Sequence, residues 1–175
     1  MSKPQQTANL TPHAPVTLRE ITQDNMDQVS SLSVSNPQKD YVASNEKSLR
    51  QAAEHVEAWT RAIYAGETLI GFLMLHDEHL RESPRRIGYY YLWRMMIDKR
   101  YQGMGFGAGA FELLVTHVRS RPHAEELLSS YKSGPDSAEG FYRRLGFEPT
   151  GEEHNGEIHI RYSLPATSKS AKSAN

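Results

Sequence analysis

The spacing of apolar residues predicts one strand and two helices in the first third of the chain. Residues 16–21 (VTLREI) alternate between apolar and polar side chains, which is the pattern of a strand with one buried face. A first helix is expected over residues 26–34, where apolar residues recur on one side. A loop that contains a proline follows over residues 36–45, and Ser48 is expected to cap a second helix from Leu49 to about Ala58.

The middle of the chain has the pattern of three strands. Trp59–Ala65 and Thr68–Leu75 are separated by a tight turn at Gly66, so the two strands are expected to form a hairpin. Residues 77–86 are charged and contain a proline, which indicates a loop. Gly88–Ile97 (GYYYLWRMMI) is the most aromatic and apolar segment, and it predicts a central strand.

The clearest helical pattern in the chain covers Gly107–Ser120. Its apolar residues recur with helical spacing at Phe111, Leu114, Val115 and Val118. A proline, Pro122, comes just after this segment, and Glu126–Tyr131 follows as a short predicted strand.

The last elements are a helix and two strands. The helix is expected over Ala138–Leu145, with Asp136 or Ser137 as its cap and Gly146 as its end. The two strands are expected over Phe147–Thr150 and Glu157–Ser163. Strands that alternate with helices in this order predict a mixed α/β sheet with crossover helices.

Composition narrows the class of protein. The 175 residues are enough for one domain, which we expect over residues 16–165, after a disordered lead (1–15) and before a flexible tail (166–175). The chain contains no cysteine, so disulfides and thiolate chemistry are excluded. A net charge of −1 argues against nucleic-acid binding. With no apolar run long enough for a signal peptide or a membrane span, we expect a cytoplasmic protein without a membrane partner.

A glycine-rich loop between a predicted strand and a predicted helix carries the chemistry. In the segment IDKRYQGMGFGA (97–108), Gly103, Gly105 and Gly107 leave backbone N–H groups free to approach a ligand. Together with the start of the helix, such groups form an anion site. The spacing G-x-G-x-G is not the dinucleotide-binding fingerprint, and the Lys-Ser/Thr of a P-loop is absent.

Two motifs resemble those of the GNAT acetyltransferases. Gln102-x-x-Gly105-x-Gly107 is similar to the Q/R-x-x-G-x-G/A pyrophosphate motif of this family, and AEGFYRRLGF (138–147) is similar to its A-x-x-F-Y-x-x-x-G-F helix. The resemblance implies the GNAT fold, a mixed sheet of about six or seven strands flanked by about four helices. It implies acetyl-CoA as co-substrate, in a cleft where the strand before the loop is splayed from its neighbour. The implied cofactor-binding residues are Met95, Met96, Ile97, Gln102, Gly103, Met104, Gly105, Phe106, Gly107 and Tyr142.

The resemblance also suggests catalytic roles. Tyr142 matches the family tyrosine that protonates the departing sulfur, and a backbone N–H at Met96 or Ile97 is expected to polarise the thioester carbonyl. Many members have an asparagine where this chain has Pro135, so we do not carry that cofactor contact over.

An amine must lose a proton before it attacks. The candidate bases are Glu157 and, ranked lower, Glu46 or Asp98. His76 and His79 do not form a metal-binding motif, and we expect no metal.

Further segments suggest the acceptor. Residues 38–49, 95–103 and 156–158 resemble the bacterial diamine and spermine/spermidine acetyltransferases. The resemblance implies a polyamine acceptor and is compatible with a homodimer. A polycation requires carboxylates and aromatic faces, which Tyr41, Glu46, Trp93 and Glu157 supply as candidate substrate-binding residues. Another small amine, such as an aminoglycoside or an amino acid, and a noncatalytic acetyl-CoA sensor are the alternatives.

Overall fold

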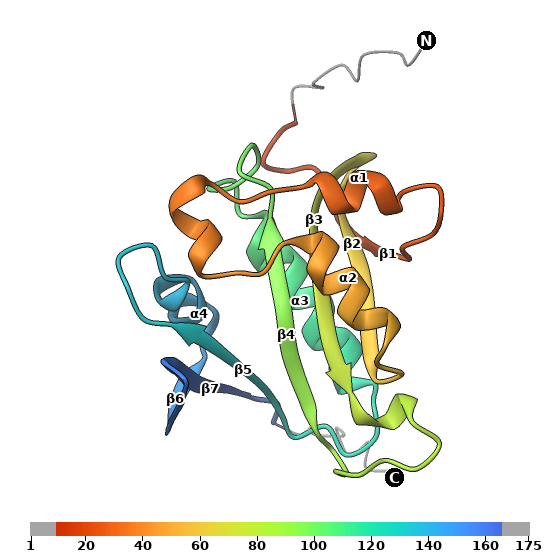
Figure 1. The fold of residues 1–175 in the computed structure, drawn as a ribbon, viewed down its shortest axis with the longest axis vertical. Coiled ribbons are helices and arrows are strands. Elements are labelled where there is room, and N and C mark those ends of the chain that lie inside the picture. Colours follow the sequence, from red (N-terminus) through yellow and green to blue (C-terminus); the bar gives the residue numbers. More distant parts are fainter. Residues whose placement is uncertain (1–9, 166–175) are drawn as a thin grey trace, which may run out of the picture.

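One seven-stranded sheet forms the centre of the molecule in the computed structural model, which describes residues 10–165 (Figure 1). The strand order is β1-β2-β3-β4-β5-β7-β6, and the one parallel pair is β4 with β5. The strands are β1 (Val16–Arg19), β2 (Ala58–Ala65), β3 (Thr68–Asp77), β4 (Tyr90–Ile97), β5 (Glu126–Lys132), β6 (Glu148–His154) and β7 (Glu157–Ser163). The mixed sheet predicted from the pattern is therefore confirmed.

Helices cover both faces of this sheet. The helices α1 and α2 lie on one face, and α3 lies on the other. The helix α4 follows β5 at the side of the sheet (Figure 1). The helices are α1 (Met26–Ser31), α2 (Asn45–Ala53), α3 (Phe106–Arg119) and α4 (Glu139–Leu145), with short 3₁₀ helices η1 (Asn36–Asp40) and η2 (Glu78–Leu80). Each face has its own apolar cluster, and α3 contributes its predicted residues Phe111, Leu114, Val115 and Val118 to one of them.

The second helix begins earlier than its pattern predicts. Ser44, not Ser48, is its N-cap, and the Ser44 hydroxyl accepts a hydrogen bond from the Lys47 backbone N–H at 3.3 Å. Ser48 lies buried inside the helix and its hydroxyl donates to the Ser44 carbonyl. The helix ends at Ala53 because residues 58–65 continue as β2, which leaves no room for a helix to Ala58.

The predicted boundaries of two other helices also change. The first helix ends at Ser31 because Leu32 already has an extended backbone. The N-cap of α4 is Ala138, and neither Asp136 nor Ser137 occupies that position. The Ser137 hydroxyl still accepts a hydrogen bond from the Glu139 N–H, so it caps the helix from one residue further out.

The described chain contacts the core from its first residues. Leu10 and Ala14 pack against the cluster beneath α3, and the Gly66 N–H donates to the Pro15 carbonyl. The remainder of the predicted lead, residues 1–9, and the predicted tail, residues 166–175, lie outside the described residues. Within residues 10–165, no helix is long and apolar enough to cross a membrane.

Candidate active site

The neighbouring strands β4 and β5 separate soon after they meet. Their ladder contains a single pair, Tyr91 with Leu128, and the Ser129 hydroxyl then bridges to the Leu92 carbonyl at 2.9 Å. Beyond this point the strands diverge toward the C-terminal end of β4 (Figure 1). The resulting opening has unpaired backbone groups of β4 along one side, as the resemblance predicted.

The loop after β4 presents a cluster of backbone donors. Among residues 10–165, none accepts a hydrogen bond from the backbone N–H groups of residues 102–105. The first bond of α3 runs from Gly109 to Gly105 at 3.3 Å, so the N–H groups of its first turn add to the cluster. Gly103 and Gly105 have positive φ angles of 76° and 85°, and a Cβ at either would meet open space. These features fit a pyrophosphate group.

The Gln102 side chain holds this loop in place. Its Nε2 donates to the Ile97 carbonyl at 2.9 Å and to Gln38 Oε1 at 3.0 Å. Gln102 therefore ties the end of β4 to the loop and to η1. Of the predicted cofactor residues nearby, Phe106 is buried and Gly107 lies against Phe141, whose ring atoms would be 3.0 Å from a Cβ.

The backbone N–H groups of Met96 and Ile97, the two candidates for polarising the thioester carbonyl, point in opposite directions. This follows from the alternation of residues along the antiparallel β3–β4 pair. The Asp98 N–H donates to the Ile70 carbonyl of β3 at 2.8 Å. Alternate residues face the same neighbour, so the Met96 N–H also points to β3, whereas the N–H groups of Met95 and Ile97 point toward β5. Of Met96 and Ile97, only Ile97 directs its N–H into the opening.

Tyr142 lies buried on α4 beside the opening. Its ring packs on Phe147 and Tyr131, with ring centroids 5.2 and 6.3 Å away. Burial raises the pKa of the phenol above its ordinary value, and the neighbouring Ser129 hydroxyl acts in the opposite direction. Since burial disfavours the phenolate, Tyr142 keeps its proton at neutral pH.

Glu157 belongs to a chain of hydrogen bonds that starts on β4. The Tyr91 hydroxyl donates to Ser130 Oγ at 2.6 Å, and Ser130 Oγ donates to Glu157 Oε2 at 2.5 Å. Burial lowers the pKa of the neighbouring Arg94, and the charge of Glu157 opposes this effect. The charges of Arg94 and Glu157 also act on the pKa of the Tyr142 phenol, in opposite directions.

Two of the other predicted substrate residues lie on segments that border the opening. The Tyr41 ring lies against Gly134 of the β5–α4 loop, where a Cβ would come within 3.0 Å of ring atoms. Glu46 is exposed at the start of α2 and pairs with Arg50 at 3.6 Å. The preceding residue, Asn45, contacts the Met96 sulfur at 3.5 Å, which brings the start of α2 to the end of β4.

Trp93 is the extra residue of a β-bulge in β4. Leu92 pairs with Leu75, and Arg94 pairs with Met74, so Trp93 has no partner on β3. It packs with the apolar cluster beneath α1 and α2. Bulges re-aim side chains, and this one occurs where β4 leaves β5. By contrast, Tyr90 faces α3 and donates to the Pro122 carbonyl, so it does not reach the opening.

The carboxylate of Asp98, a candidate base, already accepts hydrogen bonds at both of its oxygens. Arg100 donates to its Oδ1 through both the backbone N–H and Nε, and the Ser33 N–H donates to its Oδ2. These donors hold the pKa of Asp98 below its ordinary value despite burial. Asp98 thus fastens the loop. In the described part of the chain, no three His, Cys, Asp or Glu residues are grouped so that they could hold a metal ion.

Sequence reasoning missed the residues that reach the opening from neighbouring strands. These are Tyr91, Arg94, Ser129 and Ser130. The two consecutive serines that follow two leucines in a central strand are a signal that was available, since such a strand seldom carries adjacent hydroxyls without partners.

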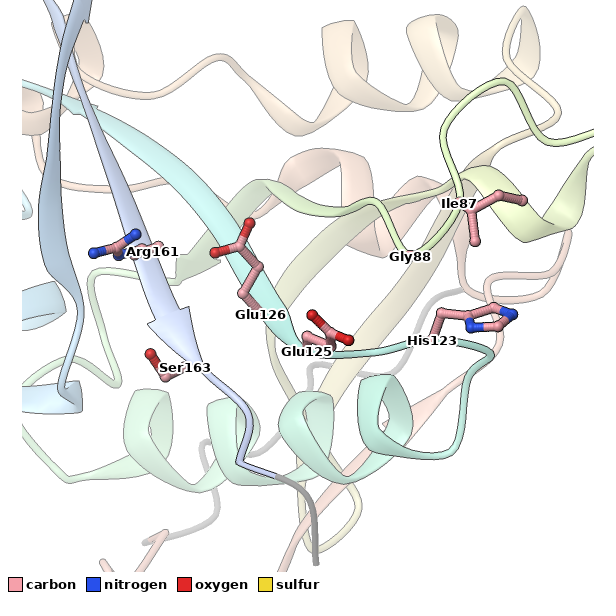
Figure 2. A pocket seen from close by; sticks show the side chains of 7 residues that line it. All are labelled: Ile87, Gly88, His123, Glu125, Glu126, Arg161 and Ser163. Atoms are coloured by element: carbon pink, nitrogen blue, oxygen red, sulfur yellow. The ribbon is translucent and has the colours of Figure 1, made fainter.

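A separate pocket of about 560 Å³ lies at the other end of β5 (Figure 2). Arg161 and Ser163 project into it from β7 and Glu126 from the start of β5. The complete lining is Ile87, Gly88, His123, Glu125, Glu126, Arg161 and Ser163. No predicted site residue lines this pocket. The pocket lies at the start of β5, whereas β4 and β5 diverge toward their C-terminal ends.

Comparison with known proteins gives the class. Residues 18–147 match the family model described as the acetyltransferase (GNAT) family. The chain is 31% identical over 146 residues to a spermine/spermidine N(1)-acetyltransferase of Bacillus subtilis strain 168, covering 81% of this chain and 94% of the relative. The chain therefore belongs to the GNAT family, and it is an acetyl-CoA-dependent N-acetyltransferase.

Solved structures show the same fold in complexes with coenzyme A. The PaiA N-acetyltransferase from Thermoplasma acidophilum matches with a TM-score of 0.62 at 14% identity, over 85% of this chain and 99% of that one. The aminoglycoside acetyltransferase AAC(6′)-Ib matches with a TM-score of 0.67 at 14% identity, over 85% and 94%. At this identity the likeness is one of fold.

Proposed function

We propose that this enzyme transfers the acetyl group of acetyl-CoA to a primary amine of a polyamine, spermidine or spermine. The relative at 31% identity that is named for spermine and spermidine supports this acceptor. The observation that carries the proposal is that a buried, protonated Tyr142 and the Tyr91–Ser130–Glu157 chain both lie beside the opening between β4 and β5.

The cofactor side of the reaction uses the loop and the end of β4. The backbone N–H groups of residues 102–105 and the first turn of α3 bind the pyrophosphate of acetyl-CoA. The Ile97 N–H polarises the thioester carbonyl as negative charge develops on its oxygen. When the C–N bond has formed and the C–S bond breaks, the Tyr142 phenol gives its proton to the coenzyme A thiolate.

The acceptor side uses Glu157. An alkylammonium has a pKa of about 10.4, so the attacking nitrogen must lose a proton first. Glu157 accepts that proton, either directly or through a water molecule, and Ser130 and Tyr91 hold the carboxylate in position. Tyr41, Glu46 and Trp93 line the path of the polyamine and supply it with π faces and a carboxylate.

Steady-state release of coenzyme A thiol across an amine panel tests the proposal. The panel contains spermidine, spermine, putrescine, an aminoglycoside, lysine and a peptide with a free N-terminus. We expect turnover with the polyamines and a loss of kcat of about 10²-fold or more in Tyr142→Phe. Tyr131→Phe, on the ring stacked against Tyr142, is the matched control for phenol removal. Turnover confined to the other amines would refute the polyamine acceptor, and tight acetyl-CoA binding without any turnover would indicate a sensor.

A further inference from the structure

A row of aromatic and imidazole rings runs along the face of the sheet that α1 and α2 share. Trp93 lies at its centre, with the ring of His55 at 5.3 Å in an edge-on arrangement and the ring of His76 at 6.0 Å. His76 in turn contacts Tyr89 at 5.2 Å, and Tyr89 stacks with Tyr91 at 6.3 Å. The row therefore leads from Trp93 to Tyr91, the first member of the hydrogen-bond chain to Glu157.

Each of the two imidazoles beside Trp93 is fixed by a buried carboxylate. His55 Nδ1 lies 3.0 Å from Glu57 Oε1, and His76 Nε2 lies 3.0 Å from Glu78 Oε1. Since an ionised carboxylate only accepts, the ring nitrogen that it binds carries the proton. In a neutral imidazole the second ring nitrogen is then a hydrogen-bond acceptor. Each of the two rings beside the indole can therefore present one such acceptor.

Two buried carboxylates lie behind these imidazoles. Glu57 and Glu78 are both about 95% buried, and Arg81 pairs with both of them, at 2.7 and 3.5 Å. Glu57 Oε2 is buried and has no hydrogen-bond donor among the described residues. This carboxylate oxygen can still accept a hydrogen bond.

Cations of the chain itself already lie against these rings. The guanidinium of Arg86 lies 3.7 Å above the Tyr89 ring, and that of Arg94 lies 6.0 Å from the Trp93 centroid. Both contacts fall within the range of cation–π attraction. The surface formed by these rings is therefore one that attracts positive groups.

We propose that Trp93, His55 and His76 form a cage for a second, non-reacting ammonium group of a linear diamine or polyamine. The indole supplies a π face, and the free nitrogens of the two imidazoles accept hydrogen bonds from the ammonium. Glu57 and Glu78 supply the counter-charge behind the imidazoles. This inference rests on the proposed function, since it assigns a binding site for the part of the acceptor that does not react.

The distance from the cage to the reaction centre suits such an acceptor. Trp93 precedes Met95 and Ile97, whose N–H groups face the opening, by two and four residues. At about 3.3 Å per strand residue, the separation is roughly 7–13 Å along β4. A linear amine with several methylenes between its nitrogens spans this range, whereas a monoamine does not reach the cage.

The test compares amines with and without a second nitrogen. We would measure kcat/KM for spermidine and for butylamine in wild type, Trp93→Leu and His55→Gln. The ratio of spermidine to butylamine is expected to fall about tenfold in each variant, because cation–π and charge-assisted contacts are lost. Trp59→Leu is the matched control, because Trp59 is the other tryptophan and stacks with His117 on the opposite face at 3.9 Å. Its ratio is expected to equal that of wild type.

The outcomes separate this inference from the proposed function. Wild-type turnover of spermidine with an unchanged ratio in both variants would overturn the cage alone. An equal loss for both amines in both variants would also overturn it, because it would indicate a structural role. If Trp93→Leu does not fold, as judged by thermal melting and acetyl-CoA binding, His55→Gln decides. Absence of polyamine turnover by the wild type would overturn the proposed function and the cage together.

Discussion

At the scale of single residues, burial determines what each ionisable group can do. Tyr142 is surrounded by the rings of Tyr131, Phe141 and Phe147, and this burial raises the pKa of its phenol. Glu157, by contrast, is only half-buried and stays in contact with Ser130. A buried proton donor and a more accessible proton acceptor suit the two ends of an acetyl transfer.

The raised pKa of Tyr142 predicts where activity is lost at high pH. In the proposed mechanism the phenol acts in its protonated form, and its pKa lies above the ordinary value of 10.0, so kcat should be retained up to pH 10 and fall only beyond it. The measurement is kcat from pH 7 to 11 at saturating acetyl-CoA, corrected for spontaneous thioester hydrolysis. A falling limb well below pH 10 that disappears in Tyr142→Phe would contradict the assignment of the acid.

Replacement of the proposed base should matter less as pH rises. Glu157→Gln removes the proton acceptor, so we expect kcat/KM for spermidine to fall about 10²-fold at pH 7. Near pH 10 much of the amine is already neutral, because its pKa is about 10.4, and the deficit should shrink. The same titration of Glu153→Gln, an exposed glutamate on β6, is the control. A deficit that is constant with pH would assign Glu157 to positioning.

At the scale of elements, the loop between β4 and α3 depends on backbone conformation. Gly105 is the N-cap of α3 in the left-handed region, where its N–H joins the donors of residues 102–104. Asp98 and Gln102 fasten the two sides of the loop with hydrogen bonds to Ser33, Ile97 and Gln38. The proposed anion site is thus a property of the whole turn.

A methyl group at Gly105 should weaken acetyl-CoA binding. Gly105→Ala strains a left-handed residue by about 1–2 kcal/mol, and relief of the strain turns the loop N–H groups away from the pyrophosphate. We expect the Kd of acetyl-CoA to rise about tenfold, measured by calorimetry. Gly151→Ala is the matched control, since its φ of 90° is close to the 85° of Gly105 and both sites are open. An equal loss of affinity in both variants would show that the effect is one of general stability.

At the scale of the whole molecule, the sheet separates two working faces. The glycine-rich loop begins α3, which packs on one face, while Trp93 packs on the face shared by α1 and α2. Ser130 and Glu157 also lie on the latter face. Ser129 of β5 pairs with Ile160 of β7, and both are buried toward α3. Because side chains alternate along a strand, Ser130 and Glu157 point to the opposite face. The divergence of β4 and β5 connects the two faces, so each substrate is expected to approach from its own side.

Buried carboxylates on this sheet should make the fold sensitive to acid. Burial by itself raises the pKa of Glu57. Hydrogen bonds from the Glu57 backbone and from His55, together with the charge of Arg81, outweigh burial and lower this pKa from 4.5 to about 2. A depressed pKa contributes stability that is complete above pH 4.5 and is lost as the pH falls toward 2. Glu57→Gln should therefore be less stable than wild type at pH 7, with the difference shrinking in acid, as measured by urea unfolding. A difference that is independent of pH would refute this account, and Glu153→Gln serves as the control.

Local sequence was sufficient for the features that are continuous along the chain. The apolar spacing of α3, the turn at Gly66 and the strand Glu157–Ser163 were all predictable, because each depends on neighbours a few residues away. The glycine-rich loop and the helix with Tyr142 were found for the same reason. The boundaries of α2 were missed because Ser44 and Ser48 are both acceptable caps, and packing of Asn45 beneath α1 decided between them.

The sequence by itself determined the family, the glycine-rich loop and the catalytic tyrosine candidate, because each is written in consecutive residues. Only the tertiary structure decided that Tyr91, Ser130 and Glu157 form one chain, that the Ile97 N–H faces the opening, and that Trp93 lies on a bulge between two imidazoles. These facts depend on strand register and on the divergence of β4 from β5. Register is set by the packing of whole strands against both cores, and a shift of one residue would reverse the face of every side chain.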